Sequence, residues 1–221
     1  MTRYLSEEQT LKAIEVLQKE GIPFYYDYEK HRIIINDQNG QEIIYLRLPL
    51  TIPPIQDLTE FYDPVHYVIL LIQSGSSAVA FCEGDEMIDH KVFKSYMVRK
   101  KQGKSQVKYL KTKGKSRAGS RVRLANTLDF FENINERLQD HFEDYTVDRI
   151  ALSCSKTLIP YLFNSKVPCP FDKKDERIYK IPRHIPTPGY DILVETHGYL
   201  QQSELMYYEE NHHLISHLTG F

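Results

Sequence analysis

The sequence has few cysteines and no long apolar run. Its three cysteines, Cys82, Cys154 and Cys169, are odd in number and widely spaced, which excludes a disulfide framework and a CxxC zinc or redox site. The longest apolar run, 68–72, is far shorter than the roughly 20 residues that a bilayer-spanning helix needs. Residues 1–8 also lack the apolar segment of a signal peptide. We therefore expect reduced thiols, no membrane partner and a cytoplasmic location.

Acidic residues are missing from one long segment. Between His90 and Leu128 the chain has thirteen lysines and arginines and no aspartate or glutamate, which leaves 15 of its 28 basic residues against all 30 acidic residues elsewhere. This segregation, hidden by a net charge of -2, favours a targeted contact with a polyanion, and nucleic acid is the leading partner. A solvated lysine-rich loop or a localisation signal is the alternative that composition leaves open.

The length of 221 residues suits one full domain with a small appendage, and residues 1–60 have the pattern of the appendage. The spacing of apolar residues predicts a helix over 6–20 with Ser6 as its N-cap. Two β-rich runs, 31–37 and 41–48, flank Asn39 and Gly40, which predicts a hairpin. Pro53 and Pro54 then indicate a linker.

Residues 61–221 have the pattern of the main domain. We expect three strands in an antiparallel meander at 66–73, 77–84 and 91–100, and a mobile basic loop over 100–120 whose glycines and lysines cannot form an apolar face. A strong helix follows, because apolar residues recur every three or four positions from Leu124 to Phe142. The remaining patterns predict a strand at 149–154, a short helix at 157–163, a strand at 177–181 and a terminal helix at 192–208. Together these elements predict a mixed α/β (α+β) fold in which helices flank a mixed sheet.

The start of the long helix bears positive charge where a helix dipole favours negative charge. We expect Arg121 and Arg123 in its first turn. A phosphate would satisfy both arginines and the exposed backbone N–H groups there, whereas the alternative is that both side chains point into water.

The segment KVFKSYMVRKKQGKSQ, residues 91–106, resembles the VLRF family of stalled-ribosome release factors. Tyr96 and Arg99 match the family's Y-x-V-R strand, Gln106 matches its glutamine, and 116–119 resembles its "SAG" junction. The resemblance covers about 88–140, with a looser match in element order to about 195. The sequence departs from classical release factors in having Gly103-Lys104-Ser105 before the glutamine in place of Gly-Gly, and it has no zinc finger, ankyrin repeats or unfoldase-binding tail.

This resemblance implies an RNase H-like release-factor middle domain whose loop reaches the peptidyl transferase centre. Gln106, Ser105 and Gly103 would be catalytic: the glutamine would position a water against the peptidyl-tRNA ester, because an amide cannot act as a general base. The expected partners are the large ribosomal subunit, rRNA and peptidyl-tRNA, with no DNA and no cofactor, and the protein is expected to be a monomer. The residues expected to bind RNA are Arg99, Lys100, Lys101, Gln102, Lys104, Lys108, Lys111, Lys113, Lys115, Arg117, Arg121 and Arg123.

The sequence also contains residues that could suggest a metal site or a phosphate-binding turn. A two-metal nuclease needs carboxylates on central strands, and the run 66–73 contains none, so we reject that reading. His212, His213 and His217 are better explained as surface residues than as metal ligands. Residues 74–77 are better explained as a β-turn than as a phosphate cradle. Two rivals stay open: cleavage of the tRNA near its CCA end by a ribose 2′-OH, and a non-catalytic module that only docks on the ribosome or RNA.

Overall fold

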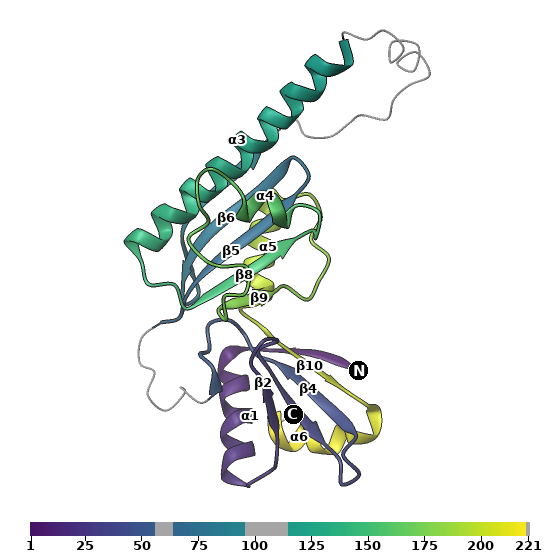
Figure 1. Ribbon diagram of the computed structural model, residues 1–221. Coiled ribbons are helices and arrows are strands. Elements are labelled where there is room, and N and C mark those ends of the chain that lie inside the picture. Colours follow the sequence, from purple (N-terminus) through teal and green to yellow (C-terminus); the bar gives the residue numbers. More distant parts are fainter. Residues whose placement is uncertain (56–63, 96–114, 220–221) are drawn as a thin grey trace.

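The computed structural model describes residues 1–55, 64–95 and 115–219, and for 115–125 it describes the backbone alone. Figure 1 shows two β-sheets stacked end to end, with one long helix that lies against the upper sheet and extends beyond it. Within the described residues, no helix combines the length and the apolar character needed to cross a membrane.

The first sheet is wholly antiparallel and has the strand order β1-β10-β4-β3-β2. Its apolar face is covered by two helices, and a single core of aliphatic side chains, including Ile14, Ile33 and Ile215, joins them to the sheet. The elements are β1 (Thr2–Leu5), α1 (Glu7–Lys19), β2 (Tyr25–Asp27), β3 (Arg32–Asn36), β4 (Glu42–Arg47), β10 (Ser203–Tyr207), the 3-10 turn η2 (Glu209–Asn211) and α6 (His212–Thr219).

Two of the sequence predictions for this sheet are confirmed at the level of local contacts. Ser6 caps α1 in a reciprocal capping box with Gln9: the Gln9 N–H donates to Ser6 Oγ at 3.2 Å, and the Ser6 N–H donates to Gln9 Oε1 at 2.9 Å. The hairpin of β3 and β4 turns at Gly40, whose φ of 81° suits the left-handed region that glycine enters without strain. β1, by contrast, was not predicted.

The prediction of a terminal helix over 192–208 is wrong in its second half. The helix α5 (Tyr190–Leu200) ends at Leu200, and the residues after it form the strand β10. The expected division at residue 60 required residues 203–219 to belong with the second sheet. β10 lies instead between β1 and β4 in the first sheet. The reason is tertiary, because the alternate burial of Ser203, Leu205 and Tyr207 has meaning only beside strands that lie far away in the sequence.

The second sheet is mixed and has the order β7-β6-β5-β8-β9. β5, β6 and β7 form the predicted antiparallel meander, although β7 begins at Glu86 and not at residue 91. β8 pairs parallel to β5, and β9 parallel to β8. A two-residue turn at Ser74 and Gly75 joins β5 to β6. The turn predicted over 74–77 is therefore confirmed at 74 and 75, whereas Ser76 and Ser77 belong to β6. The bounds are β5 (His66–Gln73), β6 (Ser76–Glu83), β7 (Glu86–Lys94), β8 (Arg149–Cys154) and β9 (Ile178–Lys180), with the helices α3 (Lys115–Asp144), α4 (Ile159–Phe163) and α5.

β5 is buried on both faces. Tyr67, Ile69 and Leu71 share one core with α5, and the alternating residues Val68 and Leu70 share another with α3. The sheet is therefore a central layer between α3 and α5, which explains why the sequence of β5 is an unbroken apolar run and not an alternating one. Within this layer Cys82 is fully buried, and burial raises the pKa of its thiol to about 12.

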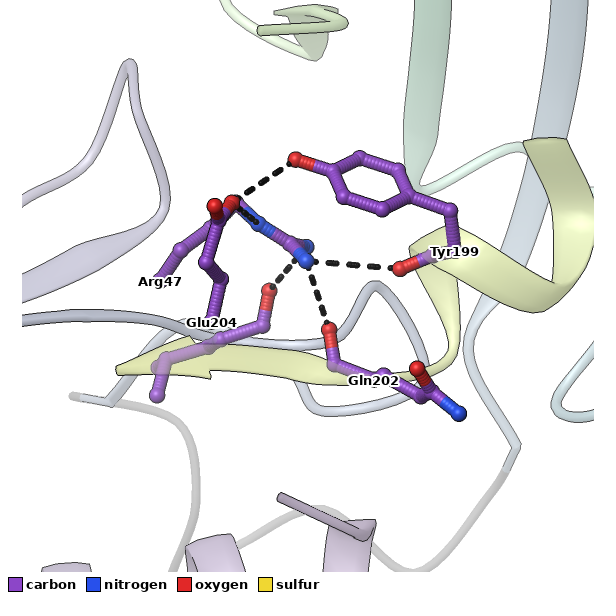
Figure 2. Close-up of polar contacts among 5 residues, drawn as sticks. Arg47, Tyr199, Gln202 and Glu204 are labelled. Atoms are coloured by element: carbon purple, nitrogen blue, oxygen red, sulfur yellow. Dashed lines mark hydrogen bonds and ion pairs between the residues drawn. The ribbon is translucent and has the colours of Figure 1, made fainter. Parts of the chain in front are cut away.

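The two sheets are joined by a buried arginine, shown in Figure 2. Arg47, at the end of β4, donates to the carbonyl oxygens of Gln202 at 2.8 Å and Tyr199 at 3.3 Å, and also to that of Leu48 at 3.4 Å. Its Nε lies 3.4 Å from a Glu204 carboxylate oxygen, which also accepts from the Tyr199 hydroxyl at 2.9 Å. Arg47 thus fixes the chain where α5 of the second layer becomes β10 of the first.

A second buried contact between the sheets centres on His31, which is fully buried and has a φ of 47°. Its Nε2 lies 3.0 Å from the carbonyl oxygen of Pro49, and its Nδ1 lies 2.6 Å from the hydroxyl of Tyr26 and 3.4 Å from Arg149 Nη2 of β8. Since a carbonyl only accepts, Nε2 carries the proton and Nδ1 accepts. Burial, together with the charge of Arg149, lowers the pKa of His31 to about 3.

Candidate functional site

The cationic segment, His90–Leu128, includes the end of β7, residues 96–114, which lie outside the described residues, and the first part of α3. β7 ends at Lys94 and α3 begins at Lys115. Ser95 joins the two elements: its N–H donates to the carbonyl oxygen of Gly75 at 2.9 Å, and its hydroxyl donates to that of Asn126 in α3 at 3.1 Å. The root of the segment is therefore fixed against the second sheet.

α3 is held along the sheet by an ionic contact with β7. Asp89 of β7 forms a salt bridge with Arg137, and His141 Nε2 lies 2.7 Å from the same carboxylate. Burial would raise the pKa of Asp89, but the hydrogen bond from His141 and the charge of Arg137 outweigh that effect and lower it. The carboxylate is therefore ionised at neutral pH and holds the carboxyl-terminal part of α3 on the outer strand of the sheet.

A buried amide fixes the other side of α3. Asn135 is fully buried, and its Nδ2 donates to the carbonyl oxygens of Leu162 at 2.9 Å and Val167 at 2.8 Å. Phe131, Ile134 and other apolar residues of the predicted helical face lie in the same core. Figure 1 shows that the amino-terminal part of α3 continues past the sheet. The helix therefore packs on the sheet through its carboxyl-terminal half.

The expected catalytic residues lie outside the described residues. This applies to Gln106, Ser105 and Gly103, and also to the expected RNA-binding residues Arg99, Lys100, Lys101, Gln102, Lys104, Lys108, Lys111 and Lys113. Lys115, Arg117, Arg121 and Arg123 lie in α3, where the backbone alone is described.

The helix begins earlier than the sequence predicts. The basic loop was expected to run to residue 120, yet α3 already begins at Lys115, so Lys115 and Arg117 are helical. The phosphate argument assumed that Arg121 and Arg123 lie in the first turn of the helix. They lie beyond the first turn of α3, so this assumption is wrong. The first turn has no acidic residue, so the sign of the charge at the helix start is as expected although the residues that supply it are different.

A hollow of about 220 Å³ lies at the root of the segment, between the end of β7 and α3. Its walls are Phe93, Lys94, Ser95, Asn126, Asp129, Phe130 and Asn133. None of these residues was singled out from the sequence. The signal that could have found them is a polar stripe on the apolar-periodic helix, because residues 126, 129 and 133 recur at spacings of three and four and so share one helical face.

The histidines near the carboxyl terminus have other contacts. His217 Nε2 lies 2.8 Å from both carboxylate oxygens of Glu20, which ties α6 to the end of α1, and the ring of His212 stacks on Tyr207. In the part of the chain that the structure describes, no three His, Cys, Asp or Glu side chains come together as a metal site would require.

Comparison with known proteins identifies one family model and two related proteins. A family model described as Bacteroidetes VLRF1 release factor matches residues 67–208, more than half of the chain. A Mus musculus protein named tRNA endonuclease ANKZF1 is 26% identical over 180 residues; the match covers 74% of this chain and 23% of that protein, so the chain spans less than a quarter of its relative. The solved structure titled "Vms1 mitochondrial localization core" aligns with a TM-score of 0.46 at 13% identity, over 94% of this chain and 86% of that one.

Proposed function

Because the chain belongs to the Bacteroidetes VLRF1 family of release factors, we propose that it hydrolyses the ester of peptidyl-tRNA on stalled ribosomes or free large subunits. The observation that carries the proposal is that the family match, residues 67–208, contains the whole acid-free segment from His90 to Leu128. Its partners would be the large subunit, rRNA and tRNA, and it would act in the cytoplasm as a monomer.

The second sheet would be the release-factor middle domain, of RNase H-like topology. Three antiparallel strands followed by two parallel strands, with helices on both faces, support this assignment. In this arrangement residues 96–114 follow the edge strand β7, so a contact between these residues and RNA would not require the buried strands to move.

Gln106 would place the attacking water, with Gly103 and Ser105 setting the approach of its backbone. Hydrolysis of the ester requires a positioned water and stabilisation of the developing oxyanion, and no protein nucleophile is obligatory. The amide of Gln106 supplies a dipole and not a base, so most of the rate enhancement would come from groups of the ribosome and tRNA. The thirteen basic residues would offset the phosphate charge around an RNA-lined site.

A second candidate is cleavage of the tRNA near its CCA end, and the name of the Mus musculus relative favours it. In that reaction a ribose 2′-OH attacks the adjacent phosphate and leaves a cyclic phosphate. Such an attack normally needs a base, yet the sequence from Lys91 to Leu128 contains no histidine, aspartate or glutamate. We therefore place hydrolysis first.

The chemical identity of both products distinguishes the two candidates. They are obtained from a purified reaction on peptidyl-tRNA bound to large subunits. Hydrolysis yields a peptide with a free carboxylate and a tRNA with an intact CCA end, as read by mass spectrometry. Nucleotides that remain on the peptide would overturn the hydrolase proposal and establish the nuclease. Gln106→Ala should abolish release while binding to the ribosome stays near that of the wild type, and Gln102→Ala is the matched control that should lower release much less.

A further inference from the structure

The hollow at the root of the cationic segment has the chemistry of a base-binding site. Phe93, which is partly exposed, and Phe130, which is 3% exposed, form its apolar part, and the exposed Lys94 lies beside them. Phe93 therefore supplies the ring surface that a ligand can contact. A volume of about 220 Å³ is below the range of pockets for drug-sized ligands and suits one planar group. Aromatic side chains beside a cation are the means by which proteins hold single-stranded nucleic acid, since every base has a face that can stack.

Two side chains on one face of α3 offer hydrogen-bond acceptors to the hollow. Asn133 donates through one Nδ2 hydrogen to the backbone carbonyl of Asp129 at 2.6 Å, which leaves its Oδ1 and its second Nδ2 hydrogen to meet a ligand. The exposed carboxylate of Asp129 can only accept while it is ionised. The Asp129 carboxylate and Asn133 Oδ1, two acceptors on one helical face, therefore border the hollow and match a ligand edge that donates.

We propose that this hollow binds one unpaired RNA base that carries an exocyclic amine, and that it prefers cytosine to uracil. Cytosine presents its N4 amine as a donor, and aspartate is a known acceptor for it. A pyrimidine with a carbonyl oxygen at that position places an acceptor against the two acceptors of α3. Two lysines supply cations for the adjoining phosphates. Lys94 lines the hollow, and the Nζ of Lys91 lies 5.3 Å from the centroid of the Phe93 ring.

The inference rests on the proposed function, since it takes RNA to be the partner of the cationic segment. It deepens that function by giving the enzyme a second contact with the strand, away from the reacting ester. Ser95 and Asn126 form both the root of the segment and part of the hollow, so a bound base lies at a fixed position relative to the root. The two cytosines of a tRNA CCA end carry the exocyclic amine and do not carry the ester, so either is a suitable occupant.

The test compares binding of two fluorescein-labelled RNAs, pentacytidylate and pentauridylate, to the full chain by fluorescence anisotropy at low salt. We expect the wild type to bind pentacytidylate about fivefold more tightly, which is the lower end of the discrimination that one base-edge contact provides. Asp129→Asn should reduce the ratio to about one, because an amide can turn its N–H toward a uracil oxygen. Equal binding of both RNAs by the wild type would overturn the proposal.

Glu132→Gln is the matched control, because it removes the same charge from a residue of α3 that does not line the hollow and lies 3.9 Å from Lys166. It should leave the ratio unchanged; if it lowers the ratio as Asp129→Asn does, the preference is a general charge effect and the proposal falls. Peptide release is measured separately. A wild type that discriminates between the RNAs but releases no peptide would refute the release function and retain the base site, and a wild type that releases peptide without discrimination would do the reverse.

Discussion

Replacement of Arg47 by methionine should strongly destabilise the junction between the two sheets. The guanidinium is nearly inaccessible, with 5% of the side chain exposed, and it satisfies three carbonyl oxygens and the carboxylate of Glu204, which is 21% exposed. Removal of one partner of a buried ion pair costs about 3–5 kcal/mol. Only the bond to Gln202 is short, at 2.8 Å, so we expect a loss near the lower end, about 3 kcal/mol. That is a large fraction of the total stability of a typical domain.

The loss is measured as the change in the free energy of unfolding in urea, followed by far-UV circular dichroism, with hydrogen exchange at 203–207 as a local readout. Arg183→Met is the matched control. Arg183 also lies over the Tyr199 ring, at 5.0 Å, and pairs with the exposed Glu195, but a surface contact of this kind contributes about 0–1 kcal/mol. A loss below about 1 kcal/mol for Arg47→Met, or equal losses for both variants, would refute the reasoning.

Three further predictions concern charge, pH and thiol reactivity. Replacement of Lys108, Lys111, Lys113 and Lys115 by glutamine should weaken RNA binding and lower its log-log salt slope by roughly one per lost phosphate contact, as measured by anisotropy across a salt series. The same change at the exposed residues Lys12, Lys156, Lys173 and Lys174 should leave the slope unaltered. The folded pKa of His31, about 3, lies below its ordinary value of 6.5, so the stability that neutral His31 contributes is complete above pH 6.5 and falls by about 1 kcal/mol per pH unit below it. Urea midpoints of His31→Asn should therefore decline less steeply than those of the wild type between pH 6.5 and 5, and parallel curves would contradict this. Cys82, buried and with its pKa raised to about 12, should react with iodoacetamide only after unfolding, whereas the half-buried Cys154 and Cys169 should react slowly in the native protein; peptide mass spectrometry at pH 8 distinguishes them, and native labelling of Cys82 at the rate of the others would disprove it.

The elements that the sequence predicts well are those whose signals are local. Ser6 and Gln9 cap α1 within one turn, and Asn39 and Gly40 form a turn that needs no distant partner. The strand β5 could be predicted because burial on both faces leaves an unbroken apolar run in the sequence. The apolar face of α3 could be predicted because burial on one face leaves apolar residues at a helical period. The residues expected to be catalytic came from a resemblance to a family and not from these patterns, and their placement stays a prediction.

Tertiary structure alone decided the features that bring distant segments together. β10 continues an apolar helical pattern in the sequence, but its ladder partners, β1 and β4, are separated from it by about 150 residues or more, and their hydrogen bonds override its local preference. The first turns of α3 lack an apolar face, yet they are helical because extension of a helix already packed on the sheet adds one hydrogen bond for each residue fixed. The neutral state of His31 and the hollow beside Asp129 likewise arise from packing, since burial and the juxtaposition of β7 with α3 are properties of the folded chain that no local run of residues encodes.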